Sequence, residues 1–361
     1  MSRMKISTRV AVAIIERAMQ SENVRDAIWY GAKEFFTQHH CQASTPGLQK
    51  LPGQYFHNGV SEPDATENKC PIFITARFRS GSTFLWNLLR NISSTTAYYE
   101  PLNENRWYMA ASAAAGVDDT HIGVEDYRQE YAGMEALDRH FREEWSFREL
   151  YMDHTYYDPA LFHYLTYLVE HAEGHPVLQF NRMDFRLPWL RANFPAAKII
   201  HLYRHPRETW MSILSKAGSD IPLVGEWGHE YYKNLFYTYE WANDLKRVFS
   251  FLEHDASRHP YEIHYHLWRL SFNFGVYYSD YSLSYEELVE KFPMQLSKVL
   301  NIVGIEDADF GKMLKMNKGK AKYRWHEYAS TDWFEEIEQR CEREQRAFFA
   351  GSGENRSIHL A

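Results

Sequence analysis

The sequence predicts an α/β fold with a mostly parallel central sheet flanked by helices. Three short runs rich in β-branched and aromatic residues, at 71–76, 198–203 and 281–285, are each followed by apolar residues at helical spacing. Strands that alternate with helices in this way are typical of a covered, mostly parallel sheet. The chain of 361 residues is 45% hydrophobic, which is enough to bury the core of such a sheet.

A helix is expected after each of these predicted strands. After the first, apolar residues recur at helical spacing over 84–92. After the second, Pro206 marks the start of a helix that runs through 210–214. After the third, apolar residues over 288–303 predict a single helix that ends at Gly304.

The domain organisation predicted from the chain has two parts. Residues 1–66 are expected to form an N-terminal helical extension and linker, with two amphipathic helices before a stretch rich in Pro, Gly and Asn. Residues 67–350 are expected to form the main domain. Within it, residues 104–175 are predicted to be a helical insert rich in aromatic side chains.

Composition excludes several function classes. With 40 Lys and Arg against 48 Asp and Glu, the net charge of −8 argues against nucleic-acid binding along a phosphate backbone. Three scattered cysteines, Cys41, Cys70 and Cys341, are too few for a disulfide framework or a zinc site, and they favour a cytoplasmic protein. The apolar run at 10–15 is too short for a signal peptide or a transmembrane segment.

A phosphate-binding loop is predicted between the first strand and its helix. Gly81 allows close backbone approach, Arg79 offers a planar cation, and the hydroxyls of Ser80, Ser82 and Thr83 are further donors. The alternative is an ordinary turn in which Ser80 or Ser82 caps the helix. The loop differs from that of nucleoside triphosphatases, because Ser82 stands where their lysine belongs.

A second anion-binding motif follows the second predicted strand. Arg204 stands at the end of that strand, and Ser212 lies eight residues later, about two turns along the next helix. The two side chains could hold one more phosphate. Together, the motifs at 79–83 and 194–207 resemble the sulfotransferases that use 3'-phosphoadenosine 5'-phosphosulfate (PAPS).

The resemblance covers about residues 70–345 and implies a P-loop-like sulfotransferase fold. It implies that the loop from Arg79 to Thr83 holds the 5'-phosphosulfate, and that Arg204 and Ser212 hold the 3'-phosphate. The product would then be 3',5'-adenosine diphosphate (PAP), and no metal is required. A third segment, 284–289, resembles the family's Tyr-Glu segment and places Tyr285 beside the adenine.

A fourth, basic segment at 318–325 resembles the late loop that closes over the nucleotide in many members, with Lys322 and Arg324 as candidates. The alternative is a basic loop that simply faces water.

The catalytic candidates are Glu100 and Arg79. Glu100 lies 21 residues after Arg79, where the tyrosyl-protein branch of the family carries its glutamate base. Its neighbours Tyr98, Tyr99 and Pro101 are expected to desolvate the carboxylate, as general-base catalysis requires. Arg79 is expected to stabilise the transferring group. The alternative for Glu100 is a surface or capping role.

Histidines are the alternative candidates for the base. Some branches use a histidine base, but His201, His205, His264 and His266 do not occupy a matching position, and the histidines at 254–266 fit no closed metal pattern.

The sequence departs from many members at Gln179, where they carry a lysine that stabilises the transferring group. Either Arg182 or Arg79 supplies the missing cation, or the donor is bound without efficient turnover.

The acceptor is expected to be a hydroxyl of a carbohydrate rather than of a phenol or a lipid. This expectation rests on the family and on aromatic side chains of the insert that suit stacking on sugar rings: Trp107, Tyr108, Tyr127, Trp145, Tyr151, Tyr156 and Tyr157. Two other function classes stay open. One is a P-loop kinase or other ATP-dependent transferase, and the other is a nucleotide-binding relative without enzymatic activity.

Overall fold

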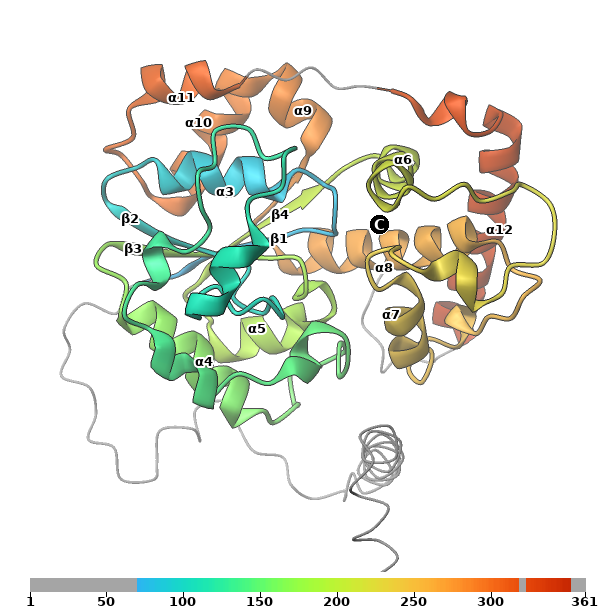
Figure 1. Cartoon of the computed structure of the whole chain (residues 1–361), viewed down its shortest axis with the longest axis horizontal. Coiled ribbons are helices and arrows are strands. Elements are labelled where there is room, and N and C mark those ends of the chain that lie inside the picture. Colours follow the sequence, from blue (N-terminus) through green and yellow to red (C-terminus); the bar gives the residue numbers. More distant parts are fainter. Residues whose placement is uncertain (1–69, 318–322, 352–361) are drawn as a thin grey trace, which may run out of the picture. The chain divides into compact units, whose positions relative to one another are not determined.

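The computed structural model describes residues 70–317 and 323–351, all of which belong to one compact unit, Pro52–Ala361. The predicted N-terminal extension at 1–66 and the candidate Lys322 lie outside the described residues. The centre is a five-stranded parallel sheet with strand order β2-β3-β1-β4-β5 (Figure 1). The strands are β1 (Ile72–Thr75), β2 (Thr95–Tyr99), β3 (His175–Phe180), β4 (Lys198–Tyr203) and β5 (Tyr281–Ser284).

The middle strand, β1, pairs with β3 on one side and β4 on the other. Ile72 lies opposite Val177 of β3 and Lys198 of β4, and the register continues to Thr75. All four residues of β1 are buried. An unbroken apolar run suits a strand covered on both faces, because neither set of alternating side chains meets water. The predicted fold class is confirmed, and β4 has the predicted bounds.

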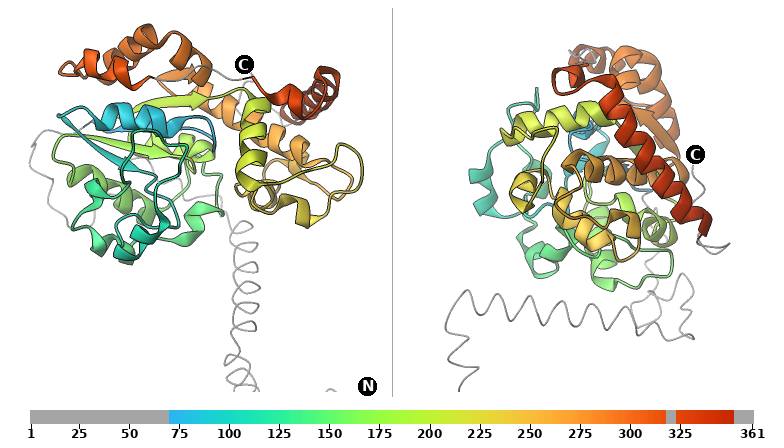
Figure 2. Two further views of the ribbon diagram at one scale, coloured as in Figure 1. Left: turned by 45° about the horizontal axis from the view of Figure 1, so that its top comes forward. Right: turned by 90° about the vertical axis from the view of Figure 1, so that its right-hand side faces the viewer.

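Helices cover both faces of the sheet. Figures 1 and 2 show α3 on one face and α4 and α5 on the other, while α12 packs against α8. Within residues 70–317 and 323–351, no helix combines the length and the apolar character needed to cross a bilayer. The helices are α3 (Ser82–Arg90), α4 (Pro159–Glu170), α5 (Leu187–Asn193), α6 (Pro206–Ala217), α7 (Thr238–Leu245), α8 (Pro260–Tyr278), α9 (Tyr285–Glu290), α10 (Phe292–Val303), α11 (Phe310–Met316) and α12 (Thr331–Gly351).

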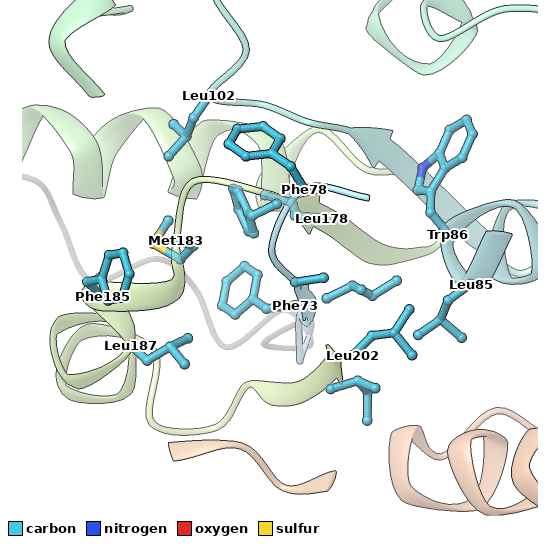
Figure 3. Close-up of a cluster of buried hydrophobic side chains, with 14 of the residues drawn as sticks. Phe73, Phe78, Leu85, Trp86, Leu102, Leu178, Met183, Phe185, Leu187 and Leu202 are labelled. Carbon is cyan, nitrogen blue, oxygen red and sulfur yellow. The ribbon is translucent and has the colours of Figure 1, made fainter. Parts of the chain in front are cut away.

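The core lies on both sides of β1. Figure 3 shows Phe73 of β1 with Leu85 of α3 to one side and Phe185 to the other. These side chains are at most 1% exposed, as is Leu178 of the neighbouring strand β3. This packing fixes the sheet and the first turn of α3 relative to each other.

Two helix predictions differ from the structure. Before α4, residues 104–158 form loops and short 3-10 turns rather than α-helices: η2 (Ala110–Ala115), η3 (Gln129–Tyr131), η4 (Glu135–Arg139) and η5 (Glu143–Ser146). The single helix expected over 288–303 is two helices, α9 and α10, with a break at Lys291. Pro293 explains the break, because proline has no N–H to donate to the carbonyl four residues earlier and its ring clashes with that carbonyl, whereas it is tolerated in the first turn of α10. Gly304 ends α10 with φ of 73°, as predicted.

Replacing Leu178 by Ala is expected to lower the free energy of unfolding by about 3 kcal/mol, because the side chain is fully buried in the central sheet and leaves a cavity. Denaturant titration followed by circular dichroism measures the change. The control is Leu314→Ala on α11, where the side chain is 39% exposed and a loss well below 1 kcal/mol is expected. Equal losses in both variants would contradict this account of the core.

Candidate functional site

One cleft collects residues that follow the carboxyl ends of all five strands. Arg79 follows β1, Glu100 follows β2, Asn181 follows β3, Arg204 follows β4 and Tyr285 follows β5, and all five line a cleft of about 960 Å³. In a parallel sheet these strand ends lie along one edge, where ligands bind in open α/β folds. The fold itself therefore brings the predicted residues together.

The predicted phosphate loop has an uncapped helix start. Gly81 is the N-cap of α3, with φ of 87° and no side-chain cap, so neither Ser80 nor Ser82 caps the helix. Without a capping side chain, the first N–H groups of α3 are available to an anion. Ser82 and Thr83 line the cleft, whereas Ser80 is fully buried and is not among the lining residues.

Gly81 also packs directly beneath the Tyr285 ring. A Cβ atom at position 81 would lie 2.3 Å from Cδ2 of Tyr285, so any other residue would force the tyrosine ring to move. The requirement for glycine thus comes both from its positive φ and from this close approach.

The two predicted anion motifs meet in space. Arg79 Nε donates a hydrogen bond of 2.9 Å to Ser212 Oγ on α6, a contact between residues 133 positions apart. The Arg204 guanidinium lies 5.2 Å from the centre of the Tyr285 ring, and its Nη1 donates to the Arg79 carbonyl at 3.4 Å. Arg79, Arg204, Ser212 and Tyr285 therefore share one end of the cleft.

Glu100 is buried, and its immediate partners are polar. Its side chain is 7% exposed and forms an ion pair of 2.9 Å with Arg182 Nη1. The side-chain amides of Asn103 and Asn181 also donate to its two oxygens. The backbone of Glu100 has φ of 40°, a conformation that is unfavourable for a residue with a Cβ.

Gln179 lies beneath the phosphate loop and is fully buried. Its Nε2 donates to Ser82 Oγ at 3.1 Å and to Asn181 Oδ1 at 2.9 Å. Ser82 Oγ in turn donates to Asn181 Oδ1 at 3.0 Å. Gln179 is therefore a support for the loop, and it is not among the residues that line the cleft.

Arg182, the expected substitute cation, does line the cleft. Its guanidinium is held between two carboxylates, Glu100 at 2.9 Å and Glu104 at 2.6 Å, and its side chain is 3% exposed. Burial opposes the charge, but the two glutamates outweigh it and raise the pKa of Arg182. Its charge is thus already compensated within the protein.

The cleft residues that were not predicted from the sequence include Asp118, His121 and Lys216. His121 contacts Thr83 Oγ1 through Nε2 at 3.2 Å, and its Nδ1 contacts the Tyr127 hydroxyl. Burial lowers the pKa of His121, which keeps the imidazole neutral at pH 7. Asp118 and His121 lie in a loop without periodicity, so no pattern marks them. Lys216 follows Ser212 by four residues, a spacing that puts both on one helix face.

The late basic segment contributes less than expected within the described residues. Arg324 is exposed, and its guanidinium pairs with Glu327 at 2.6 Å. Its backbone N–H donates to Glu208, and the residue is not among those that line the cleft.

The histidines weighed as alternative bases have structural roles. Burial lowers the pKa of His201 to about 3, and its Nδ1 contacts Ser282 Oγ at 2.8 Å. His205 caps α6 by accepting from the Arg207 N–H. His264 and His266 are buried in α8. None of these four is among the cleft residues.

Another group of potential ligands, Glu262, His266 and Cys341, lies apart from the cleft, with ligand atoms within 4.8 Å of one another. Arg258 and Arg340 pair with the two oxygens of Glu262 at 2.5 Å each. A metal ion there would face two guanidinium groups, so the charges disfavour metal binding.

Comparison with known families agrees with the geometry of the cleft. A model of the sulfotransferase family matches residues 71–309, which include both anion motifs and every strand of the sheet. The chain belongs to the sulfotransferase family. No protein with a curated description matches it.

Solved sulfotransferase structures are only distantly similar. The sulfotransferase domain of the curacin biosynthetic pathway is 17% identical, with 70% of this chain and 78% of that chain covered and a TM-score of 0.36. Mouse sulfotransferase SULT7A1, crystallised with PAP, is 15% identical, with 81% and 87% covered and a TM-score of 0.32. A sulfotransferase from Alicyclobacillus acidocaldarius is 14% identical, with 79% and 97% covered and a TM-score of 0.34.

Stability of this sulfotransferase family member is expected to fall as the pH drops below 6.5. His201 is neutral in the folded state down to about pH 3, whereas in the unfolded chain it takes up a proton near pH 6.5. The unfolded state therefore binds the extra proton, and His201 alone costs about 1 kcal/mol for each pH unit below 6.5.

Denaturant titrations at pH 6.5 and pH 5 on the wild type and on His201→Gln test this expectation. The variant is expected to lose less stability than the wild type between the two pH values. The same loss in both proteins would mean that His201 is protonated in the fold.

Proposed function

We propose that the chain transfers a sulfuryl group from PAPS to a hydroxyl group of a carbohydrate. The hydrogen bond between Arg79 and Ser212 carries the proposal, because it joins two anion motifs that are far apart in sequence. A ligand with phosphate groups at both ends of an adenosine suits two such motifs in one cleft. A cytoplasmic location stays a prediction from the few cysteines, of which Cys70 and Cys341 are free.

In the proposed complex, the 5'-phosphosulfate lies at the start of α3, where uncapped N–H groups and the helix dipole favour an anion. Arg204 and Ser212 hold the 3'-phosphate, and the ring of Tyr285 stacks with the adenine. Arg79 belongs to the loop before α3, and its side chain donates to Ser212 at the other motif. These assignments follow the family resemblance, and the fact that Arg79, Arg204, Ser212 and Tyr285 all line the cleft supports them.

In the proposed reaction, the acceptor oxygen forms a bond to sulfur while the bond between sulfur and the phosphate oxygen breaks. The acceptor proton passes to the carboxylate of Glu100, and PAP leaves with the electron pair of the broken bond. Positioning and charge neutralisation supply most of the rate enhancement in such transfers.

The proposed acceptor side of the cleft combines aromatic and hydrogen-bonding side chains. Of the seven aromatic residues expected to bind a sugar, Trp107 and Tyr127 line the cleft. Asn103, Glu104 and Asn105 add amide and carboxylate groups beside them. Aromatic faces with amides and carboxylates suit a sugar, which presents both C–H faces and hydroxyls.

One observation favours a second candidate, a nucleotide-binding relative without turnover. The Glu100 carboxylate already accepts from Arg182, Asn103 and Asn181. The Tyr99 hydroxyl also interacts with it, and burial together with this carboxylate raises the pKa of Tyr99. A carboxylate has about four lone-pair positions, so Glu100 must release one partner before it can take a proton from an acceptor.

PAP is expected to raise the melting temperature more than ADP with Mg²⁺ does. At about 100 times its Kd, PAP should add roughly 2.7 kcal/mol of stability. Differential scanning fluorimetry with both ligands measures the effect, and Ser212→Ala should reduce the shift with PAP. A larger shift with ADP and Mg²⁺ would instead support an ATP-dependent transferase.

Glu100→Gln is expected to lower kcat by at least about 100-fold, the typical contribution of a general base. Transfer of labelled sulfate from PAPS to a panel of glycans, phenols and sterols measures the rate. The comparison variant is Glu104→Gln, which removes the other carboxylate on Arg182. Because Glu104 lies on the proposed acceptor side and not at the transferred proton, its loss is expected mainly in KM for the acceptor, with kcat lowered less than about tenfold.

Equal losses of kcat in the two variants would show that the ion pair with Arg182, and not proton transfer to Glu100, determines the rate. A wild-type protein that binds PAP and transfers to none of these acceptors would support the second candidate.

A further inference from the structure

A carboxylate occupies the cation-rich end of the cleft. Asp118 Oδ2 lies 3.1 Å from Lys216 Nζ and 3.5 Å from Arg79 Nη1. Its Oδ1 accepts from the Thr120 N–H at 2.9 Å and from Thr120 Oγ1 at 2.6 Å. Asp118, Thr120, Arg79 and Lys216 all line the cleft. The carboxylate therefore lies where two cations converge.

These cations belong to the same end of the cleft as the second anion motif. Lys216 lies one turn beyond Ser212 on α6, so both side chains leave the same face of the helix. Arg79 is tied to Ser212 by its hydrogen bond of 2.9 Å. Ser212, Arg79 and Lys216 thus form one anion-binding group. In this structure the carboxylate of Asp118 is the anion that contacts Arg79 and Lys216.

Asp118 is ionised at this position. Burial opposes ionisation, but the hydrogen bonds from Thr120 and Lys216 outweigh it and hold the pKa of Asp118 below its usual range. The carboxylate therefore carries its charge at neutral pH. Its side chain is 20% exposed, so it has a path to turn toward solvent.

We propose that Asp118 occupies the place of the nucleotide's 3'-phosphate, and that Lys216 is a further ligand of this phosphate once Asp118 has moved away. The inference rests on the proposed function, because it assumes a nucleotide with a 3'-phosphate. A phosphate carries more negative charge and more acceptor oxygens than a carboxylate, so it competes well for the same cations. A ligand without the 3'-phosphate gains nothing from displacing Asp118. Lys216 therefore raises the affinity for nucleotides that carry this phosphate, whereas Asp118, which they must displace, lowers it.

The experiment compares the Kd of two nucleotides by isothermal titration calorimetry. PAP carries the 3'-phosphate, and adenosine 5'-monophosphate lacks it. Asp118→Asn is expected to bind PAP about tenfold more tightly than the wild type, and Lys216→Met about tenfold more weakly, the typical size of a close charge pair at a binding site. Affinity for adenosine 5'-monophosphate should change less than about twofold in both variants.

Asp119→Asn is the matched control for the loss of one negative charge. Asp119 is the next residue, its side chain is 88% exposed, and it lies 3.4 Å from Lys216. Its effect on the Kd of PAP should stay below about twofold, since an exposed pair contributes little. Thermal unfolding of each variant checks that the fold is intact.

Three outcomes would overturn the inference while leaving the proposed function in place. The first is weaker binding of PAP by Asp118→Asn, which would mean that Asp118 orients the cations. The second is an equal gain with adenosine 5'-monophosphate, and the third is an equal gain in Asp119→Asn. Failure of the wild-type protein to bind PAP would instead overturn the proposed function, and the inference with it.

Discussion

The parallel direction of all five strands is the constraint on which the cleft depends. It puts every carboxyl strand end at one edge of the sheet, and the chain places a polar or charged residue shortly after each end. Glu100, Arg204 and Tyr285 each come directly after a strand. The order β2-β3-β1-β4-β5 then sets the sequence of groups across the cleft, with Glu100 toward one side and Tyr285 toward the other. Because these residues lie close to the strand ends, the geometry of the sheet determines the geometry of the site.

Beneath this edge, a chain of buried polar contacts links the phosphate loop to the opposite wall of the cleft. Asn181 accepts from Ser82 and donates to Glu100, which pairs with Arg182. Arg182 pairs in turn with Glu104, whose other oxygen accepts from the Tyr237 hydroxyl at 2.6 Å. Buried charges of this kind are costly to separate, because removing one partner leaves the other unpaired. The network therefore holds the loop before α3 in a fixed position relative to Glu104 and Tyr237.

The sequence predicted the parts of the fold that have strong periodicity or a motif. The strand at 198–203 and the helix after Pro206 were found because β-branched runs and an N-terminal proline are local signals. The two anion motifs and the family resemblance predicted that Arg79 and Ser212 belong to one site. The high content of aromatic residues led to a wrong prediction of helix over 104–158. Buried rings in this segment, such as Trp145, belong to loops and 3-10 turns. Tertiary packing, which no local pattern records, decides that segment.

The uncharged side chain of Gln179 affects which residues can supply positive charge to the cleft. The family resemblance leads one to expect a lysine here, but in this chain the position is fully buried beneath Ser82 and holds an uncharged amide. The amide can donate to both Ser82 and Asn181 without bringing a charge under the loop. The nearby cation, Arg182, is neutralised by Glu100 and Glu104, so it cannot take over the missing charge without losing a partner. The other Arg and Lys side chains that line the cleft lie toward α6, where Arg79 and Lys216 pair with Asp118 and Arg204 lies 3.5 Å from Glu208. In the proposed complex, the positive charge that meets the anionic donor comes from these three residues, with the Asp118 carboxylate displaced.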